Sequence, residues 1–169
     1  MLSESARMTT AAEARFRINA PNSRPRLVKV IALDRPAEHV VKRLAGLKWN
    51  GAQFLTASAF GGAPHAEPFS MTGWLSDLAG RTTDLLDEIK TADLIVMVAT
   101  AGEEAPAASI IGEAAHLEHV MTTALVVGSS ATSDEALSHS LAQVRPHALM
   151  VVIASAEDYI EDMLIALRA

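Results

Sequence analysis

Acidic side chains at two places in the chain have the types and positions that could do chemistry. Asp34 follows one short apolar stretch, and Glu103 and Glu104 follow another. If these stretches are neighbouring parallel strands, their carboxyl ends converge and the carboxylates meet in a pocket for a metal, another cation or an amine-bearing ligand. The alternative is that Asp34 and Glu104 cap the following helices, which the helix dipole favours. The pocket candidates are Asp34, Arg35, Gly102, Glu103, Glu104 and Ser129.

Histidines supply the second set of candidates. Glu113, His116 and His119 recur at three-residue steps, which places them on one side of a helix and makes them the candidates for a metal site. Zinc-binding helices usually pair histidines four residues apart, so we favour a solvent-exposed helix end over a metal site as the explanation of these residues. His39 and His65 are candidates for a general base, with surface positions as the alternative.

Familiar catalytic motifs are missing from the sequence. It contains no G-x-G-x-x-G, no G-x-x-x-x-G-K-[ST], no G-x-S-x-G and no H-E-x-x-H. Each absence counts against one class of enzyme, although a coenzyme held by loops needs none of these fingerprints. We therefore assign no catalytic residue, predict no cofactor, and favour a protein that is not an enzyme.

Composition narrows the classes of partner. The 169 residues are 50% hydrophobic and 20% charged, which predicts one folded domain with a substantial core. The net charge of -6 has the wrong sign for a nucleic-acid or anionic-membrane binder. No segment approaches the roughly 18 to 20 apolar residues of a membrane span. The absence of cysteine fits a reducing interior, so we expect a cytoplasmic protein.

The elements that position these residues alternate along the chain in the βαβ pattern. We expect residues 1–26 to be a flexible arm and 27–169 a single domain. The domain is predicted to be α/β, a three-layer Rossmann-like fold with a mostly parallel five-stranded sheet in the order 2-1-3-4-5 and helices on both faces. The five predicted strands are Leu27 to Leu33, Gln53 to Ala57, Leu94 to Thr100, Ala124 to Val127 and Leu149 to Ala154.

Helical periodicity marks the connections between the strands. The first helix follows Pro36, and the second is expected from Leu75 to Ile89 with a weak point or break at Gly80. A third follows Pro106, and a fourth begins at a Ser133 cap. A fifth, after strand five, carries Ile160, Met163, Leu164 and Leu167 on its apolar face.

Several stretches of the chain resemble the nucleotide-binding half of the FtsZ and tubulin family. Arg26 to Ala32 and Gly51 to Ala57 look like that family's first two strands. Ala92 to Gly102 is similar to the strand leading into its glycine-rich signature, and Leu141 to Ile153 to a later helix and strand. The resemblance covers roughly residues 26 to 154 and implies a Rossmann-like nucleotide-binding domain.

The phosphate-binding parts of that family are replaced in this chain. The first turn reads Leu33 to Glu38 and contains Asp34 and Pro36, where the family has glycines. The second reads Gly102 to Ser109, with two glutamates and a proline. Phosphate binding at a helix N-terminus needs free amides and no competing anion, so we expect no bound GTP.

Two functions follow as hypotheses from this pattern. The first is a non-catalytic, degenerate FtsZ-like or Rossmann-like domain acting in protein association or regulation, as a homo-oligomer or with a protein partner. The alternative is a small-molecule-binding enzyme or ligand sensor that uses the pocket at the carboxyl ends of strands one and three. Neither hypothesis involves nucleic acid or a membrane.

Overall fold

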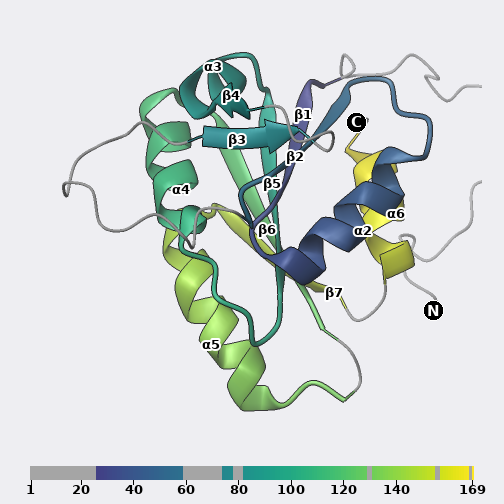
Figure 1. Ribbon diagram of the computed structural model, residues 1–169, viewed down its shortest axis with the longest axis vertical. Coiled ribbons are helices and arrows are strands. Elements are labelled where there is room, and N and C mark those ends of the chain that lie inside the picture. The colour runs from purple at the N-terminus through teal and green to yellow at the C-terminus, as the bar shows by residue number, and fades with distance from the viewer. Residues whose placement is uncertain (1–25, 59–73, 78–81, 129–130, 155–156, 168) are drawn as a thin grey trace, which may run out of the picture.

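A mixed sheet of seven strands forms the centre of the computed structural model, which describes residues 26–58, 74–77, 82–128, 131–154, 157–167 and 169 (Figure 1). The strands are β1 (Val28–Ala32), β2 (Ala52–Thr56), β3 (Trp74–Asp77), β4 (Thr82–Asp84), β5 (Leu94–Thr100), β6 (Met121–Val127) and β7 (Met150–Ala154). Their order across the sheet is β4-β3-β2-β1-β5-β6-β7.

The parallel part of the sheet contains the five strands expected from the sequence. They lie side by side as β2-β1-β5-β6-β7, all parallel. The protein is therefore an α/β protein with a Rossmann-like arrangement. It differs from the expected five-stranded sheet at one edge, where β3 and β4 add two antiparallel strands beside β2.

Helices connect the strands and lie on both sides of the sheet. Their bounds are α2 (Arg35–Ala45), α3 (Leu85–Lys90), α4 (Ala107–Leu117), α5 (Asp134–Val144) and α6 (Glu157–Ala166), and a 3-10 turn, η3 (Arg145–His147), follows α5. Figure 1 shows α3, α4 and α5 on one side and α2 and α6 on the other.

Side chains alternate along the central strands and so build two cores. In β1, Ile31 packs with residues of α3 and α4, whereas Val30 packs with α2 and α6. Every residue of β1 is buried. A strand covered on both faces reads as a largely apolar run, which is why β5, and β1 despite its Lys29, were identifiable from sequence.

The helix expected from Leu75 to Ile89 is wrong over its first half. Residues 74–77 and 82–84 form the antiparallel pair β3 and β4, and of the described residues in this segment only Leu85–Lys90 are helical. Two adjacent threonines in β4 favour extended backbone, and Asp84 then starts α3 by accepting hydrogen bonds from the amides of Leu86 and Asp87. The leucines that suggested one helix and that the structure describes therefore belong to strand β3 and to helix α3.

The remaining predicted helices occur close to their expected positions. α4 begins directly after Pro106, and Ser133 caps α5 by accepting a hydrogen bond from the amide of Ala136. β6 begins at Met121, three residues before its predicted start. Of the predicted arm, only Arg26 lies within the described residues. Within the described part of the chain, no helix combines the length and the apolar character needed to cross a membrane.

Candidate functional site

Asp34 lies where the order of the parallel strands reverses, at the carboxyl end of β1. Its side chain is 5% exposed and accepts three hydrogen bonds. Oδ1 accepts from the amide of Ala37 at 2.7 Å and from the hydroxyl of Thr100 at 2.9 Å, and Oδ2 accepts from the amide of Thr100 at 2.6 Å. Asp34 therefore caps α2 and ties the end of β1 to the end of β5.

This carboxylate lies at the N-terminus of α2. The N-terminus of a helix attracts anions through its free amides and its positive dipole end. In α2, Pro36 has no amide hydrogen. The amide of Ala37 already donates to the Asp34 carboxylate, and the amide of Glu38 donates to the main-chain oxygen of Asp34. The chain thus supplies its own anion, and the cap interpretation of Asp34 is confirmed.

The loop between β5 and α4 is held by side chains of α5. The buried Ser140 hydroxyl accepts a hydrogen bond from the amide of Gly102 at 2.8 Å and donates one to the carbonyl of Thr100 at 3.2 Å. One turn further along, the Gln143 side-chain oxygen accepts from the amide of Ala105 at 2.6 Å. Gly102 has φ 93°, a left-handed conformation that glycine adopts without strain. These contacts leave the loop few free amides for a ligand.

The two glutamates of this loop do not meet Asp34. Glu103 and Glu104 are both exposed, and a carboxylate oxygen of Glu104 lies 3.3 Å from Nε2 of His139 in α5. The cap of α4 is Pro106, and no side chain caps that helix. The expectation that Glu104 caps α4 is therefore wrong. A small open hollow of about 370 Å³ beside the loop is lined by Gly102, Ser133, Glu135, Ala136 and His139.

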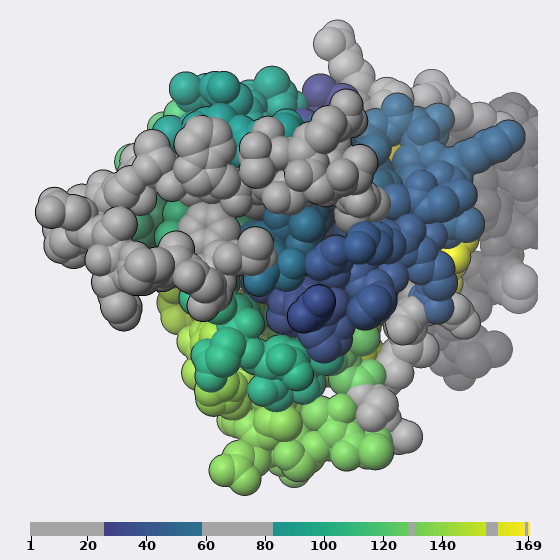
Figure 2. All heavy atoms as spheres, viewed as in Figure 1, coloured from purple at the N-terminus to yellow at the C-terminus, as the bar shows by residue number. Residues whose placement is uncertain are grey.

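Figure 2 shows the dark-blue atoms at the start of α2 next to the teal atoms of the segment that follows β5. Arg35 and His39 belong to this first part of α2, and both are exposed. Of the sequence candidates, the structure thus brings Asp34 and Gly102 into the two bonded networks and leaves Arg35, Glu103 and Glu104 on the surface. Ser129 and His65 lie outside the described residues.

Glu38 extends the polar contacts of α2. It pairs with Lys42 one turn on and accepts a hydrogen bond from the Ser58 hydroxyl at 2.9 Å. The hydrogen bond from Lys42 lowers the pKa of Glu38 below its ordinary value, and the Ser58 hydroxyl acts in the same direction, while partial burial opposes them.

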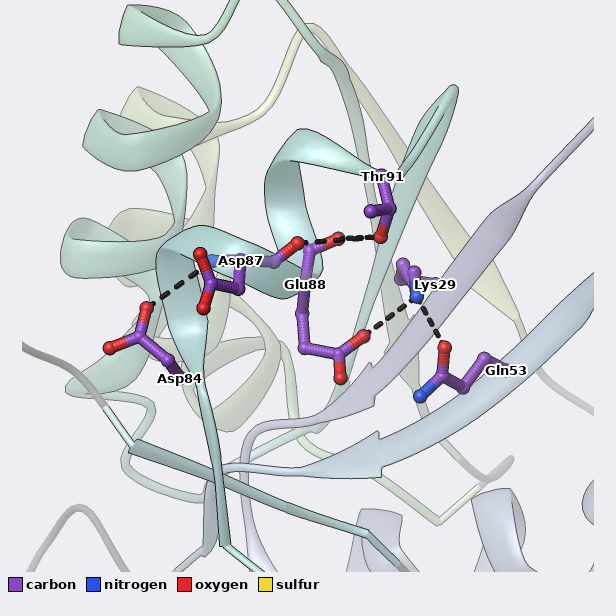
Figure 3. A network of polar contacts seen from close by, with 6 residues as sticks. All are labelled: Lys29, Gln53, Asp84, Asp87, Glu88 and Thr91. Carbon is purple, nitrogen blue, oxygen red and sulfur yellow. Dashed lines mark hydrogen bonds and ion pairs between the residues drawn. The ribbon is translucent and has the colours of Figure 1, made fainter.

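Lys29 has a structural role at the other end of β1. Its ammonium group donates to the Glu88 carboxylate of α3 at 2.7 Å and to the side-chain oxygen of Gln53 (Figure 3). Both charged side chains are largely buried, at 9% and 16% exposure. The Lys29 ammonium is therefore engaged by Glu88 and Gln53 at the amino end of β1, away from the strand reversal at its carboxyl end.

A second cavity lies at the opposite end of the sheet, near the amino ends of β6 and β7. It has a volume of about 600 Å³ and lies between the end of α4 and η3. Glu113, His116 and His119 line it together with His147, which sequence reasoning did not select. Its apolar lining includes Leu117, Val120, Met121 and Leu149.

Two unusual backbone features shape this cavity. A Cβ on Gly112, in the middle of α4, would lie 2.5 Å from the Cβ of His147, so the close approach of η3 requires glycine there. His119 has φ 58°, and the amide hydrogen bonds of His119 to His116 and of Val120 to Ala115 form a Schellman motif. Glycine usually occupies that position.

The cavity does not form a metal centre as it stands. Among the residues that the structure describes, no group of three or more His, Asp or Glu side chains is placed to hold a metal ion. Glu113, His116 and His119 share a cavity without the ligand geometry that their spacing on one helix allowed. Four residues that shape these sites were not predicted from the sequence: Thr100, Ser140, Gln143 and His147. No local sequence pattern marks their roles, because each contacts a segment that is distant in the sequence.

No protein-family model matches this chain, and a comparison with the curated proteins gives no match.

Proposed function

We propose that this protein is a non-catalytic, degenerate FtsZ-like or Rossmann-like domain that acts in protein association or regulation and does not hydrolyse GTP. The observation that carries the proposal is the Asp34 carboxylate, which accepts hydrogen bonds from Ala37 and Thr100 at the strand reversal. A phosphate at this place would have to displace a buried, charge-assisted network.

Electrostatics supports the same reading. Two unit negative charges about 4 Å apart repel by roughly 4 kcal/mol at an effective dielectric constant of 20. A phosphate approaching the start of α2 meets Asp34 without the ammonium of Lys29, which is held by Glu88 and Gln53. Ser140 and Gln143 occupy amides of the second loop. The proposal also keeps the expected cytoplasmic location and a homo-oligomer or a protein partner.

A ligand panel tests the proposal. GTP, GDP, ATP, FMN and Mg²⁺ are each added at about 1 mM, and the melting temperature is expected to stay unchanged, because a ligand that binds only the folded state raises it. The matched variant Asp34→Gly removes the internal anion and is expected to gain stabilisation by pyrophosphate that the wild-type protein lacks. Micromolar GTP binding or GTP turnover by the wild-type protein would overturn the proposal.

A small-molecule-binding enzyme or ligand sensor is the second candidate function. The hollow beside the loop after β5 has a volume of about 370 Å³ and the histidine-lined cavity one of about 600 Å³, and both volumes are in the size range of ligand pockets. A metabolite panel that raises the melting temperature of the wild-type protein distinguishes this candidate from the first. His147→Ala should abolish such a rise if the cavity holds the ligand, and Asp34→Asn should abolish it if the strand reversal does.

A further inference from the structure

Strand β7 is the edge of the sheet opposite β4. Within the described part of the chain it pairs with β6 on one side only. Its sequence is Met-Val-Val-Ile-Ala, and no charged residue occurs from Pro146 to Ala154. An edge strand presents unpaired amides and carbonyls, and proteins usually protect such edges with lysines, prolines, bulges or very short strands.

The other edge of the sheet has such protection. β4 is three residues long, with the sequence Thr-Thr-Asp. β7 has five residues, and Met150 and Ile153 are 47% and 52% exposed. Leu149, immediately before it, is 78% exposed. Side chains thus stand exposed on both faces of β7, since Met150 and Ile153 differ in parity along the strand.

Charge favours a second copy of this chain as the occupant of that edge. Two copies each carrying a net charge of -6 repel over most of their surfaces, and the neutral segment 146–154 is a place where they approach without placing like charges opposite one another. A strongly basic or acidic partner segment would find no countercharge on this strand. A two-fold dimer uses the same segment from both copies, so its interface must be self-complementary.

The sequence of the edge meets that condition in one antiparallel register. A two-fold axis through Val151 places Leu149 opposite Ile153 and Met150 opposite Val152. Each opposed pair is apolar and each pair lies on one face of the extended sheet. This register buries Leu149 and Ile153, two strongly exposed side chains of the edge, against each other. On the neighbouring helix α6, Tyr159 and Ile165 are also exposed, at 51% and 59%.

We propose that two copies of this protein pair through β7 in an antiparallel arrangement centred on Val151, forming one continuous sheet of fourteen strands from the seven of each copy. This inference rests on the proposed function, because it names a second copy of the chain as the partner in protein association. The main-chain hydrogen bonds supply the pairing, and the apolar side chains select the register.

A cysteine-pairing experiment tests the register, because the natural chain contains no cysteine. Val151→Cys places the two thiols opposite each other at the axis, where Cα atoms of an antiparallel pair lie about 4.5 to 5.5 Å apart, within disulfide range. Mild oxidation of the full-length variant at about 50 μM is expected to yield a disulfide-linked dimer as the main species on a non-reducing gel.

Ile153→Cys is the matched control. Ile153 is more exposed than Val151, which is only partly exposed, yet the two copies of residue 153 would lie roughly 13 Å apart along the strands, too far for a disulfide. This variant is expected to stay unlinked. If random collisions formed the disulfides, Ile153→Cys would be linked at least as readily as Val151→Cys. Equal linkage of both variants, or linkage of neither, would overturn the pairing.

Light scattering coupled to gel filtration gives a second, independent readout. The wild-type protein is expected to be a dimer at about 50 μM, and Ile153→Lys to weaken the dimer at least tenfold while keeping its circular dichroism spectrum. A wild-type monomer would overturn the inference. A dimer with an unlinked Val151→Cys would also overturn it but leave protein association standing. GTP binding by a linked dimer would overturn the proposed function alone.

Discussion

The Asp34 carboxylate and the amide of Thr100, 66 residues apart in the chain, are joined by a hydrogen bond of 2.6 Å. The bond links the carboxyl ends of the adjacent strands β1 and β5. It is a contact within the chain, at the point where the order of the parallel strands reverses. The stability of the fold therefore depends in part on this side chain.

Replacing Asp34 should show how much stability this contact contributes. Asp34→Ala removes the cap of α2 and leaves the partly buried Thr100 amide without its acceptor, so the free energy of unfolding should fall by about 2 to 4 kcal/mol. Urea denaturation followed by circular dichroism measures the loss. Asp34→Asn keeps one acceptor oxygen and should lose less. A loss below about 0.5 kcal/mol for the alanine variant would contradict the structural role.

The pair formed by Lys29 and Glu88 should behave as a buried ion pair. Glu88→Ala leaves an ammonium group that is largely buried, and the expected loss is about 3 to 5 kcal/mol. The double variant Lys29→Met with Glu88→Leu removes both charges and should recover most of that stability, because neither charge remains uncompensated. Thermal and urea unfolding of the single and double variants measure the coupling. Equal losses of stability in Glu88→Ala and in the double variant would mean that packing, and not the unpaired charge, causes the loss.

Gly112 should resist substitution by the residue with the highest helix propensity. In an open helix, Gly→Ala stabilises by about 1 kcal/mol. Here the added Cβ meets the Cβ and the carbonyl oxygen of His147 at 2.5 and 2.7 Å, so Gly112→Ala should instead destabilise by about 1 to 2 kcal/mol. A rise in melting temperature would show that η3 moves away from α4 easily.

Substitution of His119 by glycine should stabilise the protein, in contrast to the substitution at Gly112. Its left-handed backbone favours glycine, so His119→Gly is expected to raise the free energy of unfolding by about 0.5 to 1 kcal/mol. The matched variant His116→Gly lies in the last turn of the same helix and should lower it by about 1 kcal/mol. Urea denaturation of the two variants side by side provides the comparison. Destabilisation by His119→Gly would indicate that the imidazole makes contacts worth more than the strain.

The lowered pKa of Glu38 predicts a small dependence of stability on pH. A carboxylate whose pKa is lower in the folded than in the unfolded state stabilises the fold above its ordinary value of 4.5, and this contribution is lost as the pH falls through the folded pKa. Because Lys42 is 47% exposed, the effect should be about 0.3 to 0.5 kcal/mol. The difference between wild type and Glu38→Gln should therefore be complete at pH 6 and disappear near pH 3.

The parallel strands and most helices were readable from the sequence because their signals are local. β5 is an apolar run between polar residues, and α2 repeats its apolar positions at helical spacing behind Pro36. The segment from Leu75 to Ile89 was misread since its leucines fit a helical stripe, whereas pairing of β3 with β2 and β4 selects extended structure. Strand pairing depends on a partner segment and so leaves a weaker local pattern.

The sequence by itself determined the α/β class, the caps of α2 and α5, and the presence of acid and proline where a phosphate-binding turn would need free amides. Only the tertiary structure decided that Asp34 binds Thr100, that Ser140 holds the loop after β5, and that His147 joins His116 and His119 around one cavity. The physical reason is that caps and apolar periodicity act within a few residues, whereas these contacts form only after the sheet brings distant segments together.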